Sequence, residues 1–229
     1  MTEARHDYQQ DLDLLARKIE VLFGEVENSV QRATTALLEG DRDLAQQTIK
    51  HDDLIDELTI AVEEDVIKVI ALQAPVATDL RYLLSVLRIS SDLERSGDLA
   101  LRVAKQVFDQ SWIARADHLK PFMRRLADAS ATAFGRAAEA WSARDDSAWE
   151  DVEQIDFDVD NEYARILEEV RNLEGPQSGD IAIHCLIAAQ ALERIADHAV
   201  SITQRIRYLV TGEPEGLVGE ISPTTGYTQ

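Results

Sequence analysis

The chain contains one eight-residue segment twice: Leu93-Glu94-Arg95-Ser96-Gly97-Asp98-Leu99-Ala100 and, 99 positions later, Leu192-Glu193-Arg194-Ile195-Ala196-Asp197-His198-Ala199. Leu, Glu, Arg, Asp and Ala occupy the same places in both copies. Such self-similarity indicates one structural unit used twice. Each copy carries two carboxylates at helical spacing, so we expect the functional sites to lie in these segments.

The composition is typical of a soluble globular protein. The 229 residues are 45% hydrophobic and 29% charged. No stretch approaches the roughly 20 apolar residues that a membrane span needs, and residues 1–13 are too polar for a signal peptide. We therefore expect no membrane insertion and a cytoplasmic location. The single cysteine, Cys185, cannot form an internal disulfide and is expected to be buried on a helix.

The charge balance restricts the kinds of partner. Acidic residues number 43 against 23 basic ones, which gives a formal net charge of -20. Such a surface repels nucleic acid and anionic lipid, so direct nucleic-acid binding is not expected. The same surface attracts metal cations or a basic patch on a partner protein, although high solubility alone also explains it.

Hydrophobic residues at three- and four-residue spacing predict six long helices. Because short turns join them, three helices in each half must run antiparallel to bury their apolar stripes. The predicted fold is all-α, with two tandem, pseudo-repeated three-helix bundles in residues 1–112 and 113–211 and a flexible tail in residues 212–229. The predicted helices are Asp7–Leu38, Arg42–Leu72, Thr78–Asp109, Pro121–Ser142, Ser147–Leu173 and Gly179–Val210.

Paired carboxylates face each other across the predicted hairpin of each half. A turn at Pro75 places Asp56 opposite Glu94 and Asp52 opposite Asp98. In the second half, a turn near Pro176 places Asp160 opposite Glu193 and Asp156 opposite Asp197. Both members of each i,i+4 pair project from one helix face. Four carboxylates are therefore expected to converge in each bundle.

Such a group repels itself unless it takes up protons or binds a cation. We favour a metal site in each half, while a solvated acidic rim would show the same spacing. Oxygen ligands suit hard cations such as Mg²⁺, Mn²⁺, Ca²⁺ or iron, and zinc also stays open as a divalent alternative. His51 and His198 adjoin the carboxylates and are candidates either for outer ligands or for plain surface histidines.

The quoted motifs resemble those of the PhoU family of phosphate-signalling proteins. The resemblance rests on Pro75-Val76-Ala77-Thr78-Asp79-Leu80-Arg81, followed by the two repeated segments, and it covers about residues 7–211. It implies two three-helix bundles that hold multinuclear metal clusters on Asp52, Asp56, Glu94, Asp98, Asp156, Asp160, Glu193 and Asp197. The second half lacks an Asp-Leu-Arg after its proline, so a role of Asp79 and Arg81 is confined to the first half.

The resemblance also implies a function. Members of this family are regulatory adaptors that connect the ATPase subunit of a Pst-type phosphate transporter to a PhoR-type sensor kinase and limit phosphate uptake. A homodimer is a further family expectation. Two alternatives stay open: a metal-dependent oxidase of the carboxylate-bridged class, and a metal store or plain scaffold. The oxidase is disfavoured because the Glu-x-x-His of such bundles occurs in this sequence at Glu3 and His6, outside both sets of acids.

Local chemistry offers another interpretation of the segment after Pro75. Thr78 is expected to cap the third helix, with Asp79 in its first turn near the positive end of the helix dipole. Arg81 is expected to pair with acids of either bundle, and partner binding by this segment stays open. The three tryptophans, Trp112, Trp141 and Trp149, are expected to pack against the core.

Overall fold

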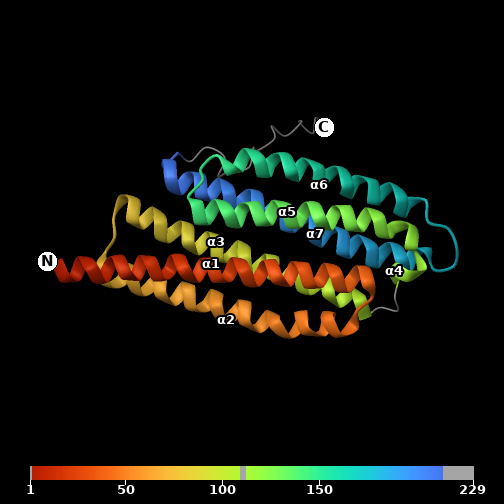
Figure 1. The fold of residues 1–229 in the computed structure, drawn as a ribbon, viewed down its shortest axis with the longest axis horizontal. Helices are drawn as coiled ribbons and strands as arrows, with labels where there is room; N and C mark the ends of the chain where they lie inside the picture. The colour runs from red at the N-terminus through yellow and green to blue at the C-terminus, as the bar shows by residue number, and fades with distance from the viewer. Residues whose placement is uncertain (1, 109–111, 214–229) are drawn as a thin grey trace, which may run out of the picture.

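Six long helices form two antiparallel three-helix bundles, as the sequence predicts. The computed structural model describes residues 2–108 and 112–213, and the predicted flexible tail lies almost wholly outside them. The first bundle contains α1 (Thr2–Glu39), α2 (Arg42–Gln73) and α3 (Ala77–Lys105), and the second contains α5 (Lys120–Ala143), α6 (Ala148–Arg171) and α7 (Ser178–Thr211) (Figure 1). None of the described helices is both long and apolar enough to cross a membrane.

Local chemistry ends these helices where the sequence suggests. Gly40 has a φ of +71°, which an L-residue rarely adopts, and Asp41 then accepts hydrogen bonds from the N–H groups of Asp43 (3.0 Å) and Leu44 (2.9 Å). Helix α2 ends at Gln73, and its C-cap residue Ala74 lies in the left-handed region just before Pro75. The prediction that Thr78 caps α3 is wrong. Helix α3 begins at Ala77 with Val76 as its cap, so Thr78 lies inside the first turn, where its hydroxyl cannot act as the cap.

The described part of the link between the bundles consists of short helical turns. A 3₁₀ turn at Gln106–Phe108, the short helix α4 (Trp112–Arg115) and a 3₁₀ turn at Asp117–Leu119 lie between α3 and α5. The side chain of Trp112 is 1% exposed, and Arg115 reaches the start of α7, where it bonds Asp180 at 2.8 Å and Gln177 at 2.9 Å. The division of the chain at residue 112 stays a prediction.

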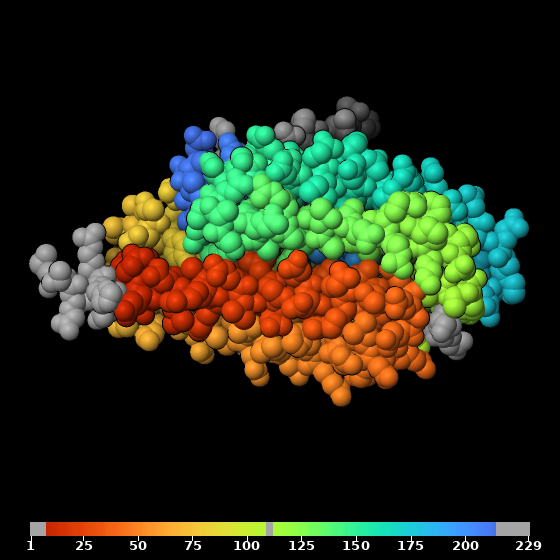
Figure 2. All heavy atoms as spheres, in the orientation of Figure 1, coloured from red at the N-terminus to blue at the C-terminus, as the bar shows by residue number. Residues whose placement is uncertain are grey.

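The two bundles share one hydrophobic core. Helix α3 packs along α7, and α1 packs along α5. Figure 2 shows α1, in red to orange, beside α5, in green, on one face of the molecule. Phe23 of α1 meets Phe134 of α5 with ring centroids 5.9 Å apart, and Tyr82 of α3 stacks on Trp141 of α5 at 6.3 Å. Burial of such side chains holds the halves together.

The single cysteine and two of the three tryptophans lie in this core. Cys185 is fully buried on α7, as predicted, and burial raises the pKa of its thiol to about 12. Trp112 and Trp141 are core residues. Trp149 is half-buried and lies under the guanidinium of Arg207 at 5.1 Å. All three therefore pack within the protein.

Candidate functional site

The first candidate site, which we call the first carboxylate cluster, consists of Asp52 and Asp56 of α2 with Glu94 and Asp98 of α3. The two helices approach closely here because Gly97 has no side chain. A Cβ at position 97 would lie 3.0 Å from Cδ1 of Ile55 on α2. Ile55 therefore fills the space that a side chain at position 97 would need, and this close approach is consistent with the predicted pairing about Pro75.

Repulsion among these carboxylates alters their pKa values. Burial, followed by the charges of Asp98 and Asp56, raises the pKa of Asp52 to about 6, and Lys105 opposes part of this shift. Burial and neighbouring acids also raise the pKa of Asp56 and of Glu94. The structure therefore brings all four predicted acids within electrostatic reach of one another, and protons bind there more readily than to isolated carboxylates.

The second carboxylate cluster repeats this arrangement between α6 and α7. Burial and the charges of Asp197 and Asp160 raise the pKa of Asp156 to about 6, and burial followed by the same two acids raises that of Glu193 to about 7. The pKa of Asp197 is raised as well. Exposure matches position by position: Asp52 and Asp156 are half-buried, as are Glu94 and Glu193, whereas Asp56, Asp98, Asp160 and Asp197 are exposed.

The donor chemistry of both clusters fits a hard cation. Carboxylate oxygens are the ligands that Mg²⁺, Mn²⁺ and Ca²⁺ prefer, and a bound cation would supply the positive charge that these acids lack. Oδ1 of Asp156 is buried without a hydrogen-bond partner, which is an acceptor that such an ion would satisfy. Among the described residues, no group of three or more His, Cys, Asp or Glu side chains is arranged so that it could hold a metal ion. Metal binding stays a prediction.

The two candidate histidines have other partners. His51 Nε2 lies 2.5 Å from Oε2 of Glu25 on α1. His198 is half-buried between α3 and α7, where its Nδ1 is 3.0 Å from Oγ of Ser96. Burial, then the charges of Arg194 and Arg95, lower the pKa of His198 to about 4, so the ring is neutral at pH 7. His198 thus belongs to the seam between the bundles rather than to the open surface.

The segment after Pro75 points toward one end of the molecule. Asp79 lies in the first turn of α3, as predicted. Burial, together with the nearby Asp79 carboxylate, raises the pKa of Tyr8 to about 12. Arg81 lies over the ring of Tyr208 of α7, with its Cζ 5.7 Å from the ring centroid, and no ion pair between Arg81 and a described acid is found. The expected pairing of Arg81 with acids is therefore replaced by a contact between the two halves.

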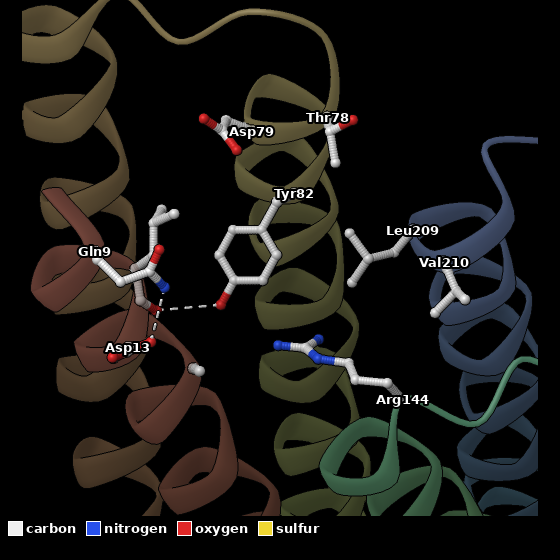
Figure 3. A pocket seen from close by; sticks show the side chains of 10 residues that line it. Gln9, Asp13, Thr78, Asp79, Tyr82, Arg144, Leu209 and Val210 are labelled. Carbon is white, nitrogen blue, oxygen red and sulfur yellow. Dashed lines mark hydrogen bonds between the residues drawn. The ribbon is translucent and has the colours of Figure 1, made fainter. Parts of the chain in front are cut away.

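A cavity of about 380 Å³ lies at this end, between α1, α3 and the ends of α5 and α7 (Figure 3). Arg144 points into it from the second half, with its guanidinium 5.3 Å from the ring of Tyr82 and 4.1 Å from that of Trp141. The Tyr82 hydroxyl donates to the Leu12 carbonyl at 3.3 Å. The sequence pattern predicts only that Arg144 lies in a turn. Its left-handed backbone (φ +56°) directs the side chain toward the other bundle, and no local pattern indicates this.

The fold and its two acidic clusters define a tandem-repeat helical-bundle protein. The PhoU domain model matches the chain twice, at residues 19–107 and 123–206. The phosphate-specific transport system accessory protein PhoU homolog of Rhizobium meliloti (strain 1021) is 30% identical over 212 residues, which cover 91% of this chain and 90% of that protein. The homolog of Pseudomonas putida is 30% identical over 207 residues, which cover 90% and 81%. The chain belongs to the PhoU family.

Solved structures agree with this assignment. The crystal structure of PhoU from Pseudomonas aeruginosa aligns with a TM-score of 0.86 at 29% identity and covers 90% of this chain and 100% of that one. The phosphate transport system regulatory protein PhoU from Streptococcus pneumoniae aligns with a TM-score of 0.78 at 26% identity, with coverage of 90% and 98%. The resemblance deduced from the motifs is thereby confirmed.

Proposed function

We propose that this protein is a regulatory adaptor that restrains phosphate uptake and the phosphate-starvation response. It would do so by linking the ATPase subunit of a Pst-type phosphate transporter to a PhoR-type sensor kinase in the cytoplasm, and it would act without catalysing a reaction. The observation that carries the proposal is similarity along nearly the whole chain to accessory proteins of a phosphate-specific transport system. Both repeats take part in that match.

In this adaptor, metal ions bound by the carboxylate clusters would hold neighbouring helices together. Each cluster combines acids from two helices of one bundle, and burial followed by their mutual repulsion raises their pKa values. A divalent or trivalent ion would relieve that repulsion and fix the outer faces of α2 with α3 and of α6 with α7. Metal binding would then set the shape of the surfaces offered to the partners or to a second copy in a homodimer.

The adaptor proposal is tested by pull-down of the transporter ATPase and of the cognate kinase with the full chain, together with phosphate uptake in a deletion strain. We expect both partners to be captured and uptake to rise when the chain is missing. Capture of neither partner, with uptake unchanged, would rule the proposal out. Light scattering of the purified chain measures whether it is a dimer.

The metal proposal is tested by elemental analysis of protein purified without chelators. The double variant Glu94→Gln with Glu193→Gln removes one half-buried ligand from each cluster and should lower metal content at least about tenfold. Glu63→Gln with Glu168→Gln is the matched control, because it changes the charge equally at exposed positions outside the clusters. Unchanged metal content and partner capture in the cluster variant would favour the plain scaffold. Oxygen consumption by iron-loaded protein would favour the oxidase.

A further inference from the structure

The duplicated arginines of the two repeats meet at one place, although the duplicated acids do not. Helices α3 and α7 run antiparallel, since Ser96 contacts His198 and Gln106 bonds His184 at 2.9 Å. Arg95 of the first repeat and Arg194 of the second therefore reach the same groove between the two bundles. The internal symmetry of the chain thus gathers two equivalent cations at the seam between its halves.

This seam groove encloses about 180 Å³ and is lined by Arg95, Asp98, Leu99, Arg102, Arg194 and His198. The three arginines are exposed to solvent. No ion pair is found between any of their guanidinium groups and a carboxylate in residues 2–108 and 112–213. The charges of Arg95 and Arg194 lower the pKa of the neighbouring Glu94 and Glu193, but the lining of the groove itself holds three arginines against one carboxylate.

Guanidinium groups favour one kind of ligand. Each presents a planar set of N–H donors and no acceptor, and this set matches the oxygens of an oxyanion better than any neutral ligand. Three such groups around a groove of this volume would surround a small tetrahedral ion. The single carboxylate there, Asp98, opposes any anion that has no proton to donate.

We propose that, while the first carboxylate cluster holds no metal, the seam groove binds one hydrogen phosphate ion, with Arg95, Arg102 and Arg194 donating to its oxygens and Asp98 accepting a hydrogen bond from its P–OH group. The choice of phosphate among oxyanions rests on the proposed function, while the anion site itself rests on the groove. The chain would then sense phosphate directly at the junction of its two halves.

Asp98 gives the groove its selectivity. Sulfate at neutral pH carries the same overall shape but no proton, so its oxygens meet the Asp98 carboxylate with repulsion. Phosphate keeps at least one proton at that pH and turns the same contact into a hydrogen bond. A site with arginines alone would not separate the two ions. The groove should therefore prefer phosphate to sulfate, and replacement of Asp98 by Asn should remove the preference.

Isothermal titration calorimetry of the full chain, freed of metal and held at constant ionic strength, tests the proposal with inorganic phosphate as the probe. We expect phosphate to bind at least about tenfold more tightly than sulfate, which corresponds to about 1.4 kcal/mol. Arg95→Gln with Arg194→Gln should weaken phosphate binding at least about tenfold. Arg17→Gln with Arg124→Gln makes the same change of charge at exposed arginines outside the groove and should leave the affinity within about twofold.

The Asp98→Asn variant provides the reverse test. It should bind sulfate about as tightly as phosphate, an outcome that simple loss of structure would not produce. The inference is overturned if the wild-type chain binds no phosphate, if the control variant loses as much affinity as the groove variant, or if sulfate binds the wild type equally well. Equal affinity for glycerol phosphate would also overturn the assignment to the free ion. Failure here with capture of the transporter ATPase intact would leave the adaptor proposal standing.

Discussion

The two carboxylate clusters have the same acids and the same pattern of exposure, but their surroundings differ. In the first cluster Lys105 of α3 lowers the pKa of Asp52 and offsets part of the repulsion. The equivalent position of α7 is Gln204, and every charge that acts on Asp156 raises its pKa. The candidate ligands are thus the same in both repeats, but the charge beside them differs. Without a bound cation, we expect the electrostatic repulsion among the acids to be less compensated in the second cluster.

The packing beneath the clusters differs as well. Gly97 allows α2 and α3 to approach until Ile55 fills the space of a missing side chain. Its counterpart is Ala196, which is fully buried. A methyl group is therefore tolerated under the second cluster but would press against Ile55 under the first. The first cluster depends on close helix packing, whereas the second depends more on relief of its charge.

The largest expected effect is on this helix packing. Gly97→Val would push branched carbons into Ile55 and should lower the free energy of unfolding by about 2 kcal/mol, because a well-packed interface has no room for them. Thermal and urea unfolding measure the change. Ile55→Val, which removes the methyl group nearest to Gly97, should restore part of the loss in the double variant. Additive losses would show that the two residues do not press on each other.

The next effect concerns pH. The folded chain holds protons on Asp52, Asp156 and Glu193 with pKa values of about 6, 6 and 7, well above those of the free side chains. At these three groups the unfolded state binds fewer protons between about pH 4 and 7, so the stability of the metal-free protein should fall as pH rises through this window. The lowered pKa of His198, about 4, acts in the opposite direction and reduces this fall, but one group does not outweigh three. After allowance for solvent screening, we expect about 1 kcal/mol per cluster, or a few degrees in Tm.

A pair of variants sharpens the comparison between the halves. Asp156→Asn with Glu193→Gln should flatten the decline of Tm between pH 5 and 8 more than Asp52→Asn with Glu94→Gln does, because Lys105 already offsets part of the charge in the first cluster. Differential scanning calorimetry in the presence of a chelator measures both. An equal effect of the two pairs, or a Tm that rises with pH, would contradict the expectation that repulsion is less compensated in the second cluster.

Substitutions in the turns that precede α2 and α6 should change the free energy of unfolding by a smaller amount. Asp41 caps α2 through two backbone N–H groups, so Asp41→Ala should lower the free energy of unfolding by about 1 kcal/mol at any salt concentration. Asp145, before α6, accepts hydrogen bonds from the N–H (3.0 Å) and the hydroxyl (2.7 Å) of Ser147 and also pairs with Arg136, with Nη2 to Oδ2 at 2.5 Å. Because Asp145→Ala removes both these hydrogen bonds and a half-buried ion pair, high salt should reduce the ion-pair part of its loss and leave the rest, whereas the loss from Asp41→Ala should change less with salt. Urea unfolding at low and high salt distinguishes the two turns.

Much of this architecture follows from local chemistry. Apolar periodicity and the stop signals at Gly40 and Pro75 gave the six helices to within a few residues, and short loops forced the helices of each half to be antiparallel. The pairing of Asp52 with Asp98 followed from counting back from the turn. Local reasoning failed at Thr78, because whether a residue caps a helix depends on where the chain leaves the preceding loop. Val76 takes that place.

The sequence by itself determined the helices, the duplication and the facing of acids across each hairpin, since these depend on spacing along one or two neighbouring segments. The packing of one bundle against the other was decided by the tertiary structure. That packing placed His198 beside Ser96, aimed Arg144 at Tyr82 and brought Arg95 and Arg194 to one groove. Contacts between segments about 100 residues apart depend on the fit of whole helix faces, which no local pattern records.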